Sequence, residues 1–256
     1  MQILLPPSET KREGGSGSLD TELLAFGPAL TPAREAVRAA LEALCAPDAD
    51  EETAVKALKL GVKNRGEIAR NRSIGSSGIM AAIDRYTGVL YDALDAQTIG
   101  AQARAWCGAH VQIQSALFGR VRALDPIPAY RLSASSKLPD LGKPLKRVWA
   151  PAHEELDAPA FTLDLRSKDY AQLAPLRAGE GHSLHVAQRG ADGQVRALNH
   201  FNKAAKGDLV RRLAQTGQAV SSVEELIAWA KDAGLNLDFD GDTLTLVTEL
   251  GAPTRA

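Results

Sequence analysis

Lysine and arginine are the side chains of this sequence most able to do chemistry, because they are concentrated in three short segments. Segments 56–72, 137–147 and 196–212 hold 15 of the 30 basic residues but only 3 of the 31 acidic residues. They carry a net charge of +12, and the rest of the chain carries −13. If folding brings them to one surface, that surface attracts phosphate groups although the whole chain is almost neutral. The alternative is three separate solvated faces that point in different directions.

The third of these segments predicts a helix over 200–215 with a cationic face. Because successive residues of a helix are turned by 100°, three cations fall on one broad face, and two leucines point away from it toward a core. Three cations on one face favour a polyanionic partner over a single small substrate. The face carries Lys203, Lys206 and Arg211.

The first segment predicts two short helices, 52–60 and 63–71, which are separated at Leu60-Gly61-Val62. A helix, a tight glycine turn and a second helix form the kind of hairpin that grips one DNA phosphate with backbone amides. An ordinary helical corner has the same sequence pattern. The sequence alone leaves both interpretations open.

The elements that must position these side chains mix strands, helices and hairpins. An amphipathic helix is predicted over 32–45 with Thr31 as its N-cap, and another over 222–233 with a serine cap. This mixture favours an α+β fold over a regular βαβ array, and the length fits a single domain over residues 1–256. Strands are expected at 2–5, 111–114 and 160–165, and hairpins at 183–198 and 236–248.

Several classes of protein are excluded by what the sequence lacks. It has no P-loop, dinucleotide-binding fingerprint, HExxH or paired CxxC motif, so no cofactor and no metal site are expected. Its two cysteines are too few for a disulfide framework. The N-terminus does not resemble a signal peptide, and no apolar run approaches the roughly 20 residues of a membrane span. The sequence therefore predicts a cytoplasmic protein with no membrane partner, and we expect a monomer.

Five motifs, in order along almost the whole chain, resemble the YaaA family of bacterial peroxide stress-resistance proteins. Three motifs depart from the family pattern. Glu9 replaces a usual lysine, with Lys11 two places later, Asp164-Leu165-Arg166-Ser167 stands where the family has Asn-Leu-Ala-Ser, and Lys206 replaces an arginine. The motifs are PPSETK at 6–11, RYTGVLYDAL at 85–94, SALFGRVRALDPIPAYRL at 115–132, LDLRSKDY at 163–170 and FNKAAKG at 201–207.

The resemblance implies a mixed α/β domain with a positively charged cleft and a helix–hairpin–helix-like element. It also implies binding to double-stranded DNA and protection against hydrogen peroxide. As a binding module, the protein would recognise the DNA backbone and shape, because no element suits base-edge reading. The partner would be double-stranded DNA or another phosphate-bearing ligand. The expected contacts are Lys59, Lys63, Arg131, Lys137, Lys143, Lys146, Lys203, Lys206 and Arg211.

The same motifs also allow an enzyme, since they are rich in hydroxyl, amine and carboxylate groups. Such a pocket would act on a nucleotide, a nucleobase or damaged DNA, with a carboxylate as general acid or base and a lysine to stabilise anionic charge. Buried structural hydrogen bonds are the alternative explanation for these residues. The candidate catalytic residues are Glu9, Lys137, Asp164, Ser167 and Tyr170.

Overall fold

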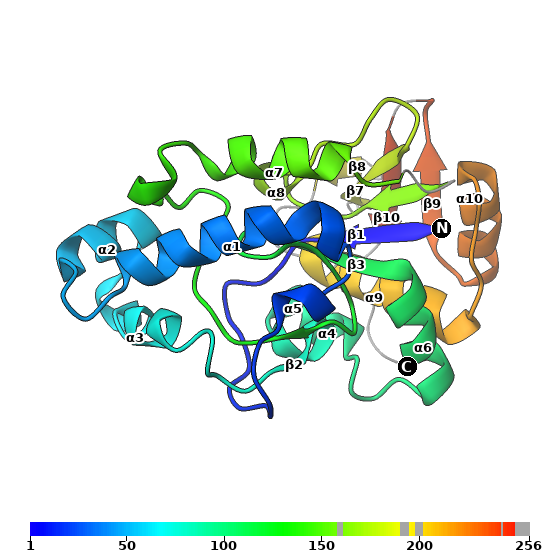
Figure 1. Ribbon diagram of the computed structural model, residues 1–256. Helices are drawn as coiled ribbons and strands as arrows, with labels where there is room; N and C mark the ends of the chain where they lie inside the picture. Colours follow the sequence, from blue (N-terminus) through cyan, green and yellow to red (C-terminus); the bar gives the residue numbers. More distant parts are fainter. Residues whose placement is uncertain (158–160, 190–194, 198–201, 242, 249–256) are drawn as a thin grey trace.

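The computed structural model describes residues 1–157, 161–189, 195–197, 202–241 and 243–248. Within these residues the chain forms an eight-stranded mixed sheet in the order β4-β3-β1-β6-β7-β10-β9, with β8 paired to β7 (Figure 1). The strands are β1 Gln2–Leu5, β3 Val111–Ser115, β4 Gly119–Arg122, β6 Thr162–Asp164, β7 Gly181–Arg189, β8 Val195–Ala197, β9 Asn236–Phe239 and β10 Leu244–Thr248.

The centre of the sheet is parallel. Strand β1 pairs in parallel with β3 on one side and β6 on the other, and β6–β7 and β7–β10 are also parallel. The mixed α/β class predicted from the sequence is confirmed. The parallel centre was not predicted, because its strands are short and far apart in the sequence. The predicted hairpins form as the antiparallel pairs β7–β8 and β9–β10, although the turn residues 190–193 lie outside the described residues.

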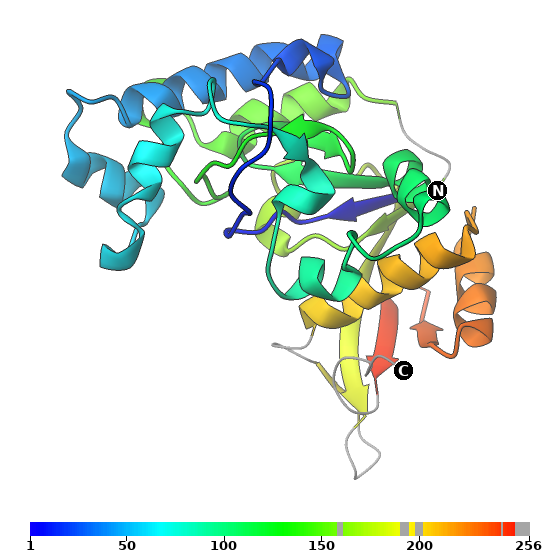
Figure 2. The same ribbon diagram turned by 90° about the horizontal axis from the view of Figure 1, so that it is seen from below.

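Helices cover both sides of the sheet (Figures 1 and 2). On one side α1 packs against α7 and β4. On the other side α9 packs against α5, α6 and β7, and α10 packs on β9. No helix among the described residues is both long and apolar enough to cross a membrane. The helices named here are α1 Gly27–Leu44, α5 Val89–Leu94, α6 Ala101–His110, α7 Leu145–Glu154, α9 Asn202–Thr216 and α10 Val223–Asp232.

Two predicted helix starts are tested by these bounds. Helix α1 begins five residues before the predicted Pro32, because Pro28 occupies its first turn. Thr31 therefore lies inside the helix and is not its cap. Helix α10 does begin after the predicted cap, since the Ser222 side chain accepts a hydrogen bond from the Glu225 backbone amide.

The segment predicted as a helical hairpin has a different form. Helix α2 (Glu51–Leu58) ends at Lys59, whose backbone is left-handed. A 3₁₀ turn, η2 (Val62–Asn64), and the short helix α3 (Glu67–Arg72) follow. The structure thus does not show two α-helices that meet at Gly61, because the residues after Gly61 form a separate 3₁₀ turn.

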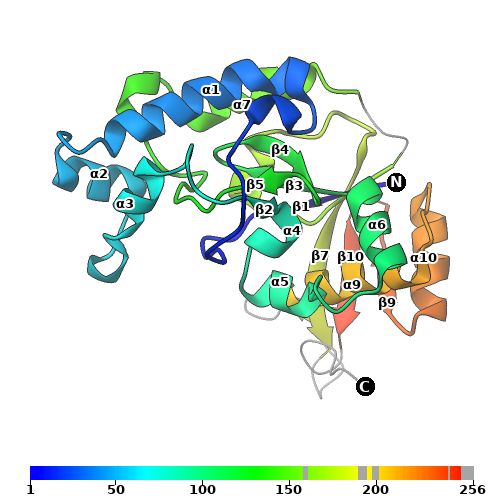
Figure 3. The same cartoon turned by 60° about the horizontal axis from the view of Figure 1, so that its bottom comes forward.

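Short elements lie beyond the end of β1 that points away from the N-terminus (Figure 3). Strand β2 (Met80–Ala81) pairs with β5 (Pro126–Ile127), and helix α4 (Ala82–Arg85) follows β2 directly. Together these elements lie beside the segment that follows β1, residues 6–11. The remaining elements are η1 Thr21–Leu23, η3 Pro139–Leu141 and α8 Lys168–Ala171.

Candidate functional site

The carboxyl end of β1 is the place in this sheet where a ligand site is expected. The chain runs from β1 to β3 on one side of β1, while β6, which comes later, lies on its other side. Such a reversal of strand order leaves a crevice outside the carboxyl ends of parallel strands, and open α/β sheets bind ligands there. The segments that follow these strands, 6–11 after β1 and 165–167 after β6, therefore contain the candidate residues.

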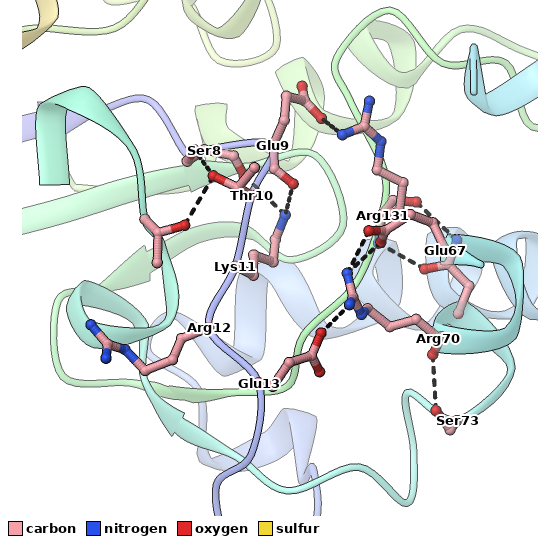
Figure 4. A network of polar contacts seen from close by, with 12 residues as sticks. Ser8, Glu9, Thr10, Lys11, Arg12, Glu13, Glu67, Arg70, Ser73 and Arg131 are labelled. Carbon is pink, nitrogen blue, oxygen red and sulfur yellow. Dashed lines mark hydrogen bonds and ion pairs between the residues drawn. The ribbon is translucent and has the colours of Figure 1, made fainter. Parts of the chain in front are cut away.

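Lys11 is the most unusual of them, because its amine is buried without an ion pair among the described residues. The residue is 9% exposed, and its backbone forms an antiparallel bridge with Tyr86. Its Nζ donates to the carbonyl oxygens of Ser8 at 2.9 Å and Glu9 at 3.4 Å. The Nζ also lies 4.2 Å from the centroid of the Tyr130 ring (Figure 4 shows the amine and its carbonyl partners).

Burial lowers the pKa of Lys11 from its usual value to about 7. The charges of Glu9 and Glu67 oppose this shift, and those of Arg131 and Arg70 add to it. A large part of the amine is therefore neutral near neutral pH. A neutral lysine can act as a nucleophile or as a general base.

Tyrosine hydroxyls form a hydrogen-bonded chain beside this amine. Ser115 Oγ accepts the backbone amides of Leu117 and Phe118, both at 3.0 Å, so its own hydrogen points to the Tyr130 hydroxyl at 2.7 Å. The Tyr130 hydroxyl is then directed to that of Tyr86 at 2.8 Å. Burial raises the pKa of Tyr86 to about 12 and that of Tyr130 well above its usual value. Both phenols thus keep their protons at neutral pH.

Arg131 and Glu9 form an ion pair next to Lys11, with Arg131 Nη1 3.0 Å from Glu9 Oε2 (Figure 4). The fully buried Asn71 fixes the backbone of Arg131, since its side chain accepts from the Arg131 amide at 2.8 Å and donates to the Arg131 carbonyl at 2.9 Å. The Nε of Arg131 is buried and has no partner among the described residues. This arginine is therefore held in place while part of its hydrogen-bonding capacity stays unused.

Asp164, a predicted catalytic residue, is instead held in a buried ion pair. Its Oδ2 lies 2.7 Å from Arg166 Nη2, and its Oδ1 accepts from Arg166 Nε and from the Arg166 amide, both at 2.9 Å. The two side chains are 4% and 0% exposed. A carboxylate that accepts three hydrogen bonds from one arginine is poorly suited to proton transfer. Its negative charge also explains how the Arg166 guanidinium can be buried.

Lys206, a predicted phosphate contact, is also buried. Its Nζ donates to the Leu165 carbonyl at 3.1 Å. Burial lowers the pKa of Lys206 to about 8, against the charge of Asp164. The predicted exposed cationic face of the helix is therefore wrong, because the helix buries this lysine against the strand end. Lys203 is exposed, but Arg211 donates to the carbonyls of Leu94 and Asp95, both at 3.0 Å.

The structure separates the other two candidate catalytic side chains. Ser167 is exposed and makes no capping hydrogen bond with α8. Tyr170 is buried, and its pKa is raised by burial and then by the charge of Glu9. Glu9 and Tyr170 therefore belong to the surroundings of Lys11, whereas Ser167 does not interact with them.

Three of the predicted lysines line one pocket of about 550 Å³. Lys137, Lys143 and Lys146 are exposed, and none of them has an acidic partner among the described residues. The Lys137 amide donates to the Ala57 carbonyl at 3.1 Å, two residues before Lys59. We call these lysines, with Lys59 and Lys63, the lysine patch. The pocket also has an apolar floor of Leu138, Pro139, Pro144, Leu145 and Leu173.

Two of the three basic segments thus come into contact through the Lys137–Ala57 hydrogen bond, and the third does not join them. Within 196–212, Lys206 and Arg211 bind backbone carbonyls, and Arg212 pairs with Asp208 at 2.7 Å. Helix α9, which carries them, lies on the other side of the sheet from α7 (Figure 2). Sequence reasoning missed Tyr130, Ser115 and Asn71 because their importance comes from contacts between distant segments.

The buried lysines predict a pH dependence of stability. Because Lys11 has a pKa of about 7 in the folded protein and about 10.4 when unfolded, the unfolded chain binds more protons between these values. The free energy of unfolding should therefore rise with pH, by about 2 kcal/mol from pH 7 to 9 for Lys11 alone. Urea denaturation at pH 7, 8 and 9 measures it. The Lys11→Met variant should lose this part of the rise. If the free energy of unfolding rises equally with pH in both proteins, Lys11 does not have the lowered pKa.

Comparison with known proteins identifies relatives over nearly the whole chain. A family described as peroxide stress protein YaaA matches residues 1–240. A UPF0246 protein of Corynebacterium glutamicum is 42% identical, covering 96% of this chain and 100% of the relative. A UPF0246 protein of Streptomyces coelicolor is 41% identical over 93% of this chain and 92% of its own length. A third, from Maricaulis maris, is 29% identical over 82% of each.

Proposed function

Because this chain belongs to the YaaA family of peroxide stress proteins, we propose that it binds double-stranded DNA through the backbone and shape of the duplex. Binding of this kind would shield DNA during hydrogen peroxide stress. The contacts are made by the lysine patch, with Lys203 as a separate outlying cation. Lys206 and Arg211 are not part of this proposal, since their side chains bind backbone carbonyls.

The observation that supports DNA binding most is the meeting of two basic segments at unpaired, exposed lysines. Asp169 also lines the pocket, but three lysines outweigh it and form no ion pair among the described residues. Their remaining repulsion is relieved by a phosphate backbone, which releases counterions as it binds. The excess of acidic charge over the rest of the chain would keep a duplex on the patch side. Lysine ammonium groups act as point charges, which suits backbone contacts better than base recognition.

A salt titration of duplex binding tests the proposal. Each phosphate neutralised lowers the logarithm of the affinity by about 0.9 per tenfold increase in salt. The triple variant Lys137→Ala, Lys143→Ala, Lys146→Ala should therefore bind more weakly and lose about 2.7 units of slope. The exposed Lys231 of α10 provides the matched control, and Lys231→Ala should leave the slope unchanged. A wild-type affinity that does not respond to salt would sink the proposal.

A second candidate function is enzymatic action on a nucleotide, a nucleobase or damaged DNA. It is favoured by the buried amine of Lys11 beside protonated tyrosines at the carboxyl end of β1. The site proposed for it contains Lys11, Glu9, Tyr170 and Arg131. It leaves out Asp164, Ser167 and Lys137, the last of which lines the lysine pocket. Mass spectrometry of a nucleotide and damaged-duplex panel tests it. Products that disappear with Lys11→Met would support the activity, and no product from any panel member would count against it.

A further inference from the structure

We infer that Lys11 is the nucleophile of an aldehyde-binding site, and that its Nζ condenses with an aldehyde carbon to form an imine. In DNA the matching group is the ring-opened deoxyribose of an abasic nucleotide, which carries an aldehyde at its first carbon. This inference rests on the second candidate function, because it names the substrate class of that site.

The position of the amine is the first argument. The backbone around Lys11 is fixed by its bridge to Tyr86 and by the Arg12 amide, which donates to the Arg85 carbonyl at 2.8 Å. This places the side chain at the strand end where the sheet predicts a ligand site. The other described buried lysine, Lys206, also reaches a strand end, where its Nζ donates to the Leu165 carbonyl, but its pKa is lowered less, to about 8.

The bonding of the amine is the second argument. A buried lysine that serves stability alone is normally paired with a carboxylate, but the nearby Glu9 carboxylate pairs with Arg131. Nζ is left with two carbonyl oxygens and two aromatic faces. Burial lowers its pKa to about 7, so much of it is unprotonated at neutral pH. An amine desolvated in this way is the form that attacks carbonyl carbon.

The reaction balances with groups that the site provides. The Nζ lone pair adds to the aldehyde carbon, and one amine proton moves to the former aldehyde oxygen to give a carbinolamine. The second amine proton moves to the same oxygen, which leaves as water when the C=N bond forms. The protonated Tyr86 phenol, which ends the hydrogen-bonded chain, can relay these protons, since it gives one to the oxygen and takes one from Nζ. Hydrolysis of the imine reverses the sequence and restores Lys11. No electrons are gained or lost, so no oxidant or reductant is needed.

On an abasic nucleotide the imine would also weaken the bond between the third carbon of the sugar and the oxygen of the 3′ phosphate. Electron withdrawal by the protonated imine acidifies the adjacent carbon, and a base removes its proton while the 3′ phosphate leaves with the bonding electrons. Glu9 is the carboxylate whose charge acts most strongly on Lys11, and its side chain is 45% exposed, so it can accept this proton. Arg131 lies beside Glu9 with an unused buried Nε, which is a donor for the departing phosphate.

The segment that covers the Lys11 amine is itself partly exposed. Ser8 and Glu9, whose carbonyls hold Nζ, belong to a segment in which Glu9 and Thr10 are exposed. An aldehyde therefore enters by displacing these two carbonyls. The lysine pocket lies near this entrance, since it is lined by Asp169, the chain neighbour of Tyr170, and the charge of Glu9 acts on Tyr170. A duplex held by the patch would thus run past the Lys11 site.

Borohydride trapping tests the inference on the full chain. Sodium borohydride reduces an imine to a stable secondary amine, so a duplex with one abasic site should become covalently attached to the protein. Peptide mapping should place the adduct on Lys11, and the yield should fall at least tenfold in Lys11→Met and Lys11→Arg. Lys231→Met, which removes an exposed amine outside the proposed DNA contacts, should keep the adduct. An intact duplex should give none.

Peptide mapping of the wild type needs no variant, so it decides the matter even if a Lys11 variant does not fold. No adduct at all, or an adduct on other lysines that survives in Lys11→Met, would overturn the inference. Glycolaldehyde provides a second arm without DNA. If it labels Lys11 while the duplex is not bound, the aldehyde site stands and DNA binding fails. If the duplex is bound with the expected salt slope but neither aldehyde labels Lys11, DNA binding stands and the aldehyde site fails.

Discussion

Replacement of Asp164 by alanine is expected to destabilise the protein by about 3–5 kcal/mol, because it leaves the guanidinium of Arg166 buried without its counter-charge. The carboxylate accepts three hydrogen bonds from Arg166, and the arginine side chain is fully buried. The change is measured as the free energy of unfolding in urea. Asp169→Ala, which removes an exposed carboxylate five residues later, should change stability by less than about 0.5 kcal/mol.

A double variant separates the stability lost through the unpaired charge from the stability lost through the cavity. Asp164→Ala combined with Arg166→Met removes both charges, and it should recover a large part of the lost stability, since buried ion pairs are often replaceable by apolar side chains. If Asp164→Ala alone costs less than about 1 kcal/mol, the pair does not hold Arg166 as described. Any loss of function in an Asp164 variant should accordingly follow unfolding, and this distinguishes it from Lys11.

Replacement of Arg85 by methionine is expected to have a comparable effect, about 3–5 kcal/mol, for a different reason. Arg85 is fully buried, and its guanidinium donates to four backbone carbonyls from three segments. Each buried acceptor that loses its partner costs about 1–3 kcal/mol, and relaxation recovers part of the sum. The carbonyls belong to Ile127 at 3.0 Å, Gly14 at 3.0 Å, Gly78 at 2.7 Å, and Arg12.

The position of the destabilised residues in Arg85→Met is as informative as the loss of stability. Because Arg12 and Gly14 follow Lys11 directly, hydrogen exchange should become faster at residues 12–15 in Arg85→Met before it does in the sheet. Arg85→Lys keeps the charge but loses the forked geometry, so it should be destabilised too. Arg65 provides the control, because its guanidinium pairs with Glu51 and Glu52 at the surface and Arg65→Met should cost at most about 1 kcal/mol. Similar losses in the two variants would contradict this account of Arg85.

Local patterns in the sequence were enough to find most elements of the fold. Strand β1, helices α1, α2, α9 and α10, and the hairpins near the C-terminus have signals within about 15 residues, whereas helix α7 and strands β4 and β5 were not predicted. The parallel pairing of β1 has none, because it joins residues that are more than 100 positions apart. A mixed α/β class could therefore be predicted, but the strand order that exposes the end of β1 as a ligand site could not.

The sequence also could not show which basic residues of the candidate site are buried. A count of basic residues treats every lysine and arginine as exposed, yet Lys206, Arg85 and Arg166 are buried and bind carbonyls or a carboxylate. Helical periodicity gave the direction of Lys206 on its helix but not which neighbour covers that side. Lys137, Lys143 and Lys146 were predicted together because they lie in one short segment, and the structure brings them to one pocket.

The pairing of β1 also bears on how the chain matures. Ile3 is synthesised long before its partners in the sheet, Val111 and Leu163. Strand β1 must therefore wait, unpaired, until β3 has left the ribosome, and it gains its second neighbour only after β6 has followed. Long-range pairings of this kind slow folding and expose apolar strands to aggregation. We expect nascent chains shorter than about 165 residues to require chaperones, and full-length chains to gain their protease resistance in a single late step.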